Sequence, residues 1–168
     1  CTSDSGLRHK WEGMINGTAE KDPDTGIYTV QTVRKIFEAL SGRGSKTECA
    51  LSLIRMLGEE QNEELHRFAA VAFSMAMGID SIIGQYKPDT LLAIIPNAGS
   101  RFDVKRRIED ACAYFRNAMY GDPEMENLRF VAGTVTESME TADYDSLLIR
   151  AGYLNERGKN LAMDTVVF

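Results

Sequence analysis

Residues 81–97, SIIGQYKPDTLLAIIPN, are the part of the sequence that decides the fold. Two short apolar runs, 82–83 and 91–95, flank a centre that is rich in turn-forming residues. β-Branched residues favour strands, and Pro and Asp favour a tight turn between them. The stretch therefore predicts a β-hairpin with its tip at residues 86–89, in an otherwise helix-rich chain. We expect the function of the domain to be visible at this tip.

Apolar residues at helical spacing predict helices on both sides of this hairpin. They cover residues 5–20, 30–40, 58–76, 101–120 and 143–154. In the helix at 58–76 we expect the buried face to be Leu65, Phe68, Ala69, Ala72, Met75 and Ala76. Short apolar runs predict further strands at 49–56, 128–136 and 162–168. This order predicts an α+β fold with a split-βαβ, ferredoxin-like core, in which a five-stranded, mainly antiparallel sheet carries helices on both faces.

The size and charge of the chain narrow the class of protein. At 168 residues it fits one domain, and 43% hydrophobic with 26% charged residues is typical of a globular protein. A net charge of −6 argues against nucleic-acid partners and against membrane contact by this domain, because both surfaces are anionic. The polar N-terminus has no signal-peptide core, so we expect residues 1–20 to be a linker helix and residues 21–168 to be the domain.

The cysteines give a prediction about the compartment. Cys1, Cys49 and Cys112 are odd in number and lack metal-ligand spacing, so they support neither a disulfide framework nor a zinc site. The longest apolar runs are far shorter than the roughly 20 residues of a membrane span. We therefore expect a cytoplasmic domain without a metal or other cofactor.

Four short motifs stand in order along the chain, at 22–27 (DPDTGI), 91–96 (LLAIIP), 131–135 (VAGTV) and 158–160 (GKN). Together they resemble the GGDEF domain family, the diguanylate cyclases that make cyclic di-GMP from two GTP molecules. The resemblance runs from about residue 22 to the C-terminus. It implies the family's nucleotidyl-cyclase-like fold.

The signature turn of that family, R-Y-G-G-D-E-F, aligns with residues 85–91, QYKPDTL. Lys87 and Pro88 replace both glycines, and Pro88 lacks the N–H that a close backbone contact would use. Asp89 is retained, whereas Thr90 stands at the position of the catalytic acidic residue. The resemblance therefore implies a degenerate turn.

The metal ligands implied by the resemblance are also missing. Cyclisation needs divalent cations held by carboxylates from at least two segments. The family's D-x-D segment aligns with residues 55–57, where Arg55 brings a cation instead. The family's product-inhibition motif, R-x-x-D, aligns with residues 78–81, which contain no arginine. We expect no catalytic residue and no metal site.

Several remaining side chains have two interpretations. Asn62 stands near the family's guanine-recognising positions, and an Asn at a helix start is also a common cap. Asp89 beside Lys87 could bind a cation or form a solvated ion pair. Lys159 could contact phosphate or be a surface lysine. A basic cluster at the start of the 101–120 helix could bind a nucleotide phosphate or an acidic partner, or form a solvated face. The cluster consists of Arg101, Lys105, Arg106 and Arg107.

The sequence therefore predicts a catalytically inactive GGDEF-like regulatory or protein-interaction module in bacterial cyclic di-GMP signalling. Its expected partners are other domains of a longer signalling protein, or a separate protein. One alternative is a receptor that binds cyclic di-GMP or GTP at a non-standard site. Another is a residual nucleotide-processing enzyme that relies on Asp89 and Lys159.

Overall fold

The computed structural model describes residues 12, 15, 19–42, 46–58, 62–119, 121–122, 128–161 and 163–168. Most of the predicted N-terminal helix and linker, residues 1–20, lies outside these ranges, and so does Cys1. Residues 59–61, at the predicted start of the helix 58–76, lie outside them as well.

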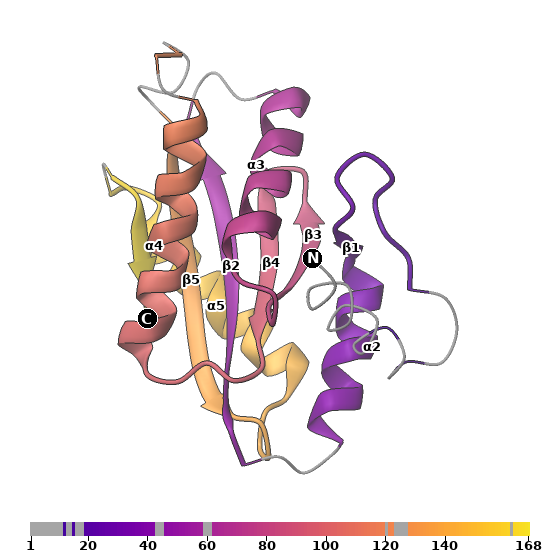
Figure 1. Ribbon diagram of the computed structural model, residues 1–168. Coiled ribbons are helices and arrows are strands. Elements are labelled where there is room, and N and C mark those ends of the chain that lie inside the picture. Colours follow the sequence, from indigo (N-terminus) through magenta and orange to yellow (C-terminus); the bar gives the residue numbers. More distant parts are fainter. Residues whose placement is uncertain are drawn as a thin grey trace.

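The centre of the molecule is a six-stranded sheet with the order β1-β3-β4-β2-β5-β6 (Figure 1). The inner pairs β3-β4, β4-β2 and β2-β5 are antiparallel. Each edge strand is parallel to its neighbour, β1 to β3 and β6 to β5. The strands are β1 (Tyr28–Thr29), β2 (Glu48–Leu57), β3 (Ile82–Lys87), β4 (Thr90–Ile95), β5 (Arg129–Ser138) and β6 (Thr165–Val167).

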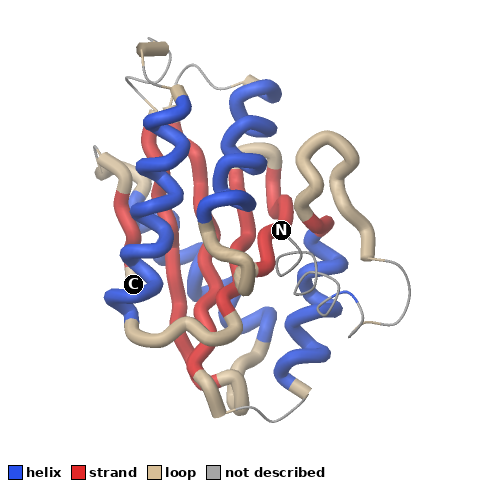
Figure 2. Tube along the Cα trace, viewed as in Figure 1, coloured by secondary structure: helices blue, strands red, loops and turns tan. Residues whose placement is uncertain are grey.

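Helices cover both faces of the sheet, as Figures 1 and 2 show. The helices α3 and α4 pack on one face, and α2 and α5 pack on the other. Their bounds are α2 (Val30–Ser41), α3 (Glu63–Ala76), α4 (Arg101–Ala118) and α5 (Tyr144–Gly158). The predicted α+β fold is confirmed. The expected count of five strands was one too low, because the two-residue β1 is too short to leave a pattern in the sequence.

The predicted hairpin is confirmed. Strands β3 and β4 flank a two-residue turn at Pro88 and Asp89, and the register shifts between Gln85 and Lys87. Every residue of β4 is buried, because this strand lies inside the sheet between β3 and β2. The hairpin therefore lies within the sheet rather than protruding from it.

The DPDTGI motif forms a tight loop before β1. The side-chain Oδ1 of Asp22 accepts hydrogen bonds from the backbone N–H of Asp24 at 2.8 Å and of Thr25 at 3.2 Å. Gly26 has a φ of +75°, which glycine adopts without a steric penalty. The motif thus has a structural role in leading the chain into β1 and α2.

Aromatic rings fill the core between the sheet and α3 with α4. The ring of Phe130 lies 5.0 Å from that of Phe73 and 5.2 Å from that of Phe115, measured between centroids. The predicted apolar face of α3 was partly wrong, because Phe68 and Met75 are 37% and 64% exposed. Phe73 turns to the sheet instead, and Phe68 packs from outside against the ring of Phe115.

The two described cysteines are core thiols. Cys49 and Cys112 are both buried and unpaired. Burial raises the pKa of Cys49 to about 11 and moves the pKa of Cys112 further above its usual range. Within the described residues, no helix is both long and apolar enough to cross a lipid bilayer.

Candidate functional site at the hairpin tip

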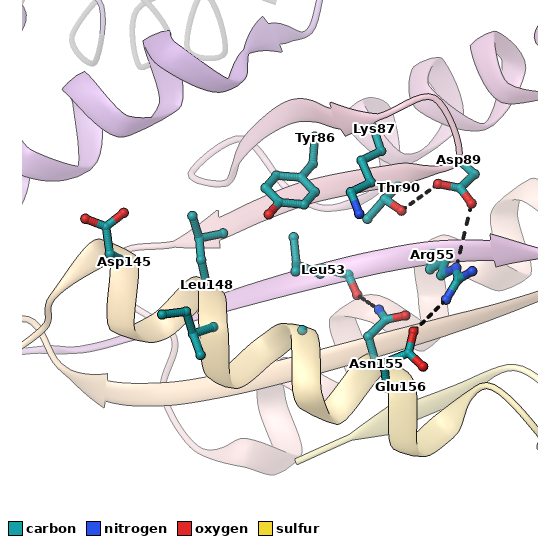
Figure 3. Close-up of a pocket in the computed structure, with 12 residues that line it drawn as sticks. Leu53, Arg55, Tyr86, Lys87, Asp89, Thr90, Asp145, Leu148, Asn155 and Glu156 are labelled. Carbon is teal, nitrogen blue, oxygen red and sulfur yellow. Dashed lines mark hydrogen bonds and ion pairs between the residues drawn. The ribbon is translucent and has the colours of Figure 1, made fainter.

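A cavity of about 650 Å³ lies between the tip of the hairpin and α5 (Figure 3). Strand β2 contributes Leu53 and Arg55 to its wall, and α5 contributes side chains along most of its length. From the hairpin come Tyr86, Lys87, Asp89 and Thr90. The cavity therefore brings together three of the four residues predicted at the signature turn.

Strand periodicity explains why Arg55 reaches this cavity. Successive side chains of β2 point to opposite faces, and Ile54 and Met56 belong to the core beneath α3 and α4. Leu53 and Arg55 therefore point to the face that α2 and α5 cover. In the sheet register, Arg55 stands opposite Thr90 of β4.

The guanidinium of Arg55 links the hairpin tip to α5. Its Nε lies 3.6 Å from Oδ2 of Asp89, and its Nη1 lies 3.2 Å from Oε1 of Glu156 (Figure 3). The Arg55 and Asp89 side chains are each one-third exposed, so water screens the pair only in part. A fixed positive charge thus lies between the two carboxylates.

The carboxylates of the cavity have further partners. Oδ1 of Asp89 accepts a hydrogen bond from the Thr90 hydroxyl at 2.9 Å. The hydrogen bond from Lys159 Nζ, 2.9 Å from Oε2, holds the pKa of Glu156 below its usual range. At the other end of α5, the hydrogen bond from Arg34 similarly lowers the pKa of Asp145. Glu156 and Asp145 therefore remain charged and paired near neutral pH.

Asn155 is the most buried polar residue of the cavity, with 5% of its surface exposed. Its Nδ2 donates hydrogen bonds to the backbone oxygens of Leu53 at 2.6 Å and Val131 at 3.1 Å. Its Oδ1 is buried and has no hydrogen-bond partner among the described residues. A buried polar atom without a partner costs free energy, and with less than 1 Å² of accessible surface this oxygen is not open to a molecule in the cavity.

Gly133 permits α5 to approach β5 this closely. A Cβ at this position would lie 2.2 Å from the carbonyl oxygen of Ala151 and 2.6 Å from the backbone nitrogen of Asn155. Gly133 is the glycine of the VAGTV motif. The motif therefore sets the position of the helix that forms one wall of the cavity.

Lys87 and Asp89 do not form the predicted ion pair. The Nζ of Lys87 lies 5.8 Å from the ring centroid of Tyr86, and Asp89 pairs with Arg55 instead. Pro88 lies towards α3, where it lines a small recess with His66. Asp89 and Thr90 line both this recess and the cavity, whereas Lys87 lines only the cavity and Pro88 only the recess.

The other predicted site residues lie away from the cavity wall. Lys159 pairs with Glu156 just beyond it. In the basic cluster of α4, the Nη1 of Arg107 lies 2.7 Å from Oδ1 of Asp80, and Arg101 lies over the ring of Phe168. Lys105 and Arg106 are exposed. The four cations therefore do not form one site.

Asn62 caps α3, as one of its two interpretations predicted. Its side chain accepts a hydrogen bond from the backbone N–H of Leu65 at 2.8 Å. This contact accounts for an asparagine at this position without a nucleotide.

Sequence reasoning missed Asn155 and Glu156. The predicted helix ended at Leu154, whereas α5 continues to Gly158. The spacing of Leu147, Ala151 and Asn155 at intervals of four residues could have extended the prediction by a turn.

Across the described residues, no group of three or more His, Cys, Asp or Glu side chains could hold a metal ion.

Comparison with known proteins relates this arrangement to a fold family. No protein-family model matches the chain, and no curated protein matches it. Among solved structures, the GGDEF domain of DgcB from Caulobacter crescentus, in complex with c-di-GMP, aligns with a TM-score of 0.71 and 12% identity over 91% of this chain and 97% of that chain.

Two structures from Pseudomonas aeruginosa align as well. The FimX GGDEF domain has a TM-score of 0.60 and 13% identity, over 89% of this chain and 99% of that chain. The diguanylate cyclase SiaD, in complex with its activator SiaC, has a TM-score of 0.62 and 13% identity, over 99% of this chain and 66% of that chain. At these identities the likeness concerns the fold alone. The chain has the fold of a GGDEF domain, as its motifs predicted.

Proposed function

We propose that the chain is a catalytically inactive GGDEF-like domain that acts as a regulatory or protein-interaction module in cyclic di-GMP signalling, within a longer cytoplasmic protein. The observation that carries the proposal is the position of Arg55. Its guanidinium lies between Asp89 and Glu156, the two carboxylates nearest the hairpin tip.

Electrostatics supports the absence of metal-dependent chemistry. Hard cations such as Mg²⁺ need several oxygen ligands, and carboxylates are the strongest of these. A dication near Asp89 would lie close to the Arg55 guanidinium, which is 3.6 Å from that carboxylate. Repulsion between a unit charge and a dication about 4 Å apart amounts to several kcal/mol at an effective dielectric constant near 20. Arg55 thus supplies the neutralising charge that a metal would otherwise bring.

The turn itself supports the same conclusion. Lys87 and Pro88 occupy the positions that the family's resemblance gives to two glycines. Pro88 has no N–H to offer a phosphate, and Lys87 carries a side chain where a glycine has none. Thr90 donates its hydroxyl to Asp89 instead of contributing a carboxylate.

A turnover assay tests the proposal. The chain is incubated with GTP and Mg²⁺ at equal concentrations of enzyme and substrate, and cyclic di-GMP is measured by chromatography. We expect no product, with the diguanylate cyclase SiaD as positive control under the same conditions. Formation of cyclic di-GMP above the level of an Asp89→Asn variant would overturn the proposal.

A second candidate is a receptor that binds cyclic di-GMP or GTP without turnover. The cavity favours it, since it combines the Tyr86 ring with the Lys87 ammonium. An aromatic base could stack on Tyr86, while Lys87 would face a phosphate.

Calorimetry with GTP and with cyclic di-GMP, each without metal, tests this candidate. Binding that Lys87→Glu weakens at least tenfold and Lys105→Glu leaves unchanged would support it, because Lys105 is exposed on α4 away from the cavity. If neither GTP nor cyclic di-GMP gave a binding heat, the receptor candidate would be ruled out.

A further inference from the structure

The hairpin cavity, the space of about 650 Å³ between the hairpin tip and α5, is elongated along the helix. Its lining residues on α5 run from Asp145 to Glu156. These positions are eleven residues apart in the sequence, which corresponds to about 16 Å, or about three helical turns. Figure 3 shows α5 on one side of this space and Tyr86 with Lys87 on the other. The hairpin cavity is therefore a groove that follows α5.

The wall that α5 gives to this groove is apolar in its middle. Leu148, Ile149 and Gly152 line it there, and Leu53 of β2 lines it as well. Residues three and four apart on a helix lie on the same side of it, so Leu148, Ile149 and Gly152 form one strip. The Ile149 side chain is 61% exposed. An apolar strip that remains open to water on one side of a helix is suited to packing against another molecule.

Gly152 is a glycine that the packing of the fold does not explain. At Gly133 and Gly158 a Cβ would overlap its neighbours, at 2.2 Å from the carbonyl oxygen of Ala151 and at 2.5 Å from Cγ1 of Val131. A Cβ at Gly152 would meet no described atom within 4 Å, although this residue lies inside α5. Glycine lowers the stability of a helix relative to alanine. What it provides here is a backbone that a second molecule can approach closely.

The charges of the groove favour an acidic group on the partner. Each of the three carboxylates that line it is paired with an arginine of the fold. Lys87 differs from them, because no ion pair joins it to another described residue. It is exposed at the hairpin tip, with its Nζ 5.8 Å from the ring centroid of Tyr86. An acidic side chain that contacts Lys87 would gain an ion pair without breaking one within the fold.

A helix of another protein matches these features together. Packed helices lie about 8 to 10 Å apart, and a glycine at the contact permits the shorter distances. A helix of about 11 residues has the length of the groove, so one face can cover the apolar strip while one end reaches Lys87. A phosphate bound at Lys87 alone would leave the apolar strip without a role. A second copy of this chain fits less well, because each copy carries a net charge of −6.

We propose that the hairpin cavity binds an amphipathic helix of a partner protein. The apolar face of this helix packs on Leu148, Ile149 and Gly152, and an acidic side chain near one end pairs with Lys87. The proposal rests on the proposed function, since it names the kind of partner that the interaction module recognises. It also gives the cavity an occupant other than the nucleotide of the receptor candidate.

A phage-displayed library of helical peptides is the probe. Each peptide is an alanine-rich helix of about 20 residues, long enough to form in isolation, and is randomised along one face. Selection on the native chain should enrich apolar residues at intervals of three and four, with Asp or Glu near one end. Enrichment of basic residues instead, or of no sequence at all, would overturn the proposal.

Fluorescence anisotropy with the most enriched peptide, synthesised with a fluorescein label, locates the binding site. Gly152→Leu fills the space above the helix backbone, and Lys87→Glu reverses the charge at the tip, so each should weaken binding at least tenfold. Gly152→Leu keeps α5 intact, because leucine favours a helix more than glycine and its Cβ meets no described atom within 4 Å.

Two matched controls make similar changes on the other face of the sheet. Ala113→Leu and Lys105→Glu both alter exposed positions of α4 and should change peptide binding less than twofold. Circular dichroism checks that all four variants are folded. Peptide binding that Gly152→Leu and Lys87→Glu weaken no more than these controls do would contradict the proposed site.

The outcomes distinguish this proposal from the proposed function. A chain that forms no cyclic di-GMP and also binds no peptide keeps its catalytic inactivity and loses the docking site. Formation of cyclic di-GMP in the turnover assay overturns the proposed function whether or not a peptide binds. Binding of cyclic di-GMP that Gly152→Leu abolishes, without any selected peptide, would assign the groove to a nucleotide and overturn the helix proposal.

Discussion

Helix α5 carries opposite chemistry on its two sides. On the side of the hairpin tip, the acids Asp145 and Glu156 are each paired with cations from elsewhere in the fold. On the other side, Arg150 and Arg157 line a cavity of about 270 Å³ beside β5, and none of the described residues that line it is acidic. Arg150 there pairs with Glu137 of β5, at 3.5 Å. Where charges neutralise one another within the fold, little remains to hold an ion.

Both sides depend on the close approach of α5 to β5 at Gly133. A side chain there would overlap backbone atoms of Ala151 and Asn155. We expect Gly133→Ala to lower the free energy of unfolding by about 3 kcal/mol, because helix backbone cannot yield as a flexible side chain can. Urea denaturation followed by circular dichroism measures this. The same variant should also displace α5 from the hairpin cavity that it lines.

Gly152 on the same helix provides the matched control. A Cβ there would meet nothing within 4 Å. Gly152→Ala should therefore raise the free energy of unfolding by up to about 1 kcal/mol, the difference in helix propensity. If the two variants were equally destabilised, the close packing at Gly133 would not be what positions α5.

Asn155 is buried on α5, whereas Tyr153, two residues earlier on the same helix, is exposed. Asn155→Ala removes two hydrogen bonds to backbone oxygens of β2 and β5, so we expect a loss of about 1 to 2 kcal/mol. Tyr153→Ala removes a side chain that is 69% exposed and should change stability by less than about 0.5 kcal/mol. Thermal melting of both variants measures the difference. A larger loss of stability for Tyr153→Ala than for Asn155→Ala would mean that the Tyr153 side chain packs more tightly than its exposure indicates.

The smallest effect concerns pH. The hydrogen bond from Arg34 lowers the pKa of Asp145, so the contribution of this carboxylate to stability is fully present above its ordinary pKa of about 4 and is lost as pH falls through the lowered value. We expect Asp145→Asn to be slightly less stable than the native chain at pH 7, and the difference to disappear towards pH 2. Melting temperatures across that range test it. A difference that persists undiminished at pH 2 would contradict the assignment.

Local pattern was enough to predict most of the fold. The apolar run of β2, the turn residues of the hairpin and the helical spacing in α4 each specify their element within a few neighbouring residues. Strand β1 escaped prediction because pairing with β3, rather than its own two residues, makes it a strand.

The candidate site could be predicted only in part. Residues 87–90 could be predicted as a candidate site because they align with the family's signature turn and differ from it. The contact between Arg55 and Glu156 joins positions 101 residues apart, and no local pattern relates them.

We propose that the Arg55 guanidinium, 3.6 Å from Asp89, takes the place of a metal ion there. Titration of the native chain with Mn²⁺, followed by the electron paramagnetic resonance signal of the free ion, tests it most directly. We predict that the native chain and Asp89→Asn deplete the free signal equally, through weak surface contacts alone. Binding of one Mn²⁺ per native chain that Asp89→Asn abolishes would contradict the account.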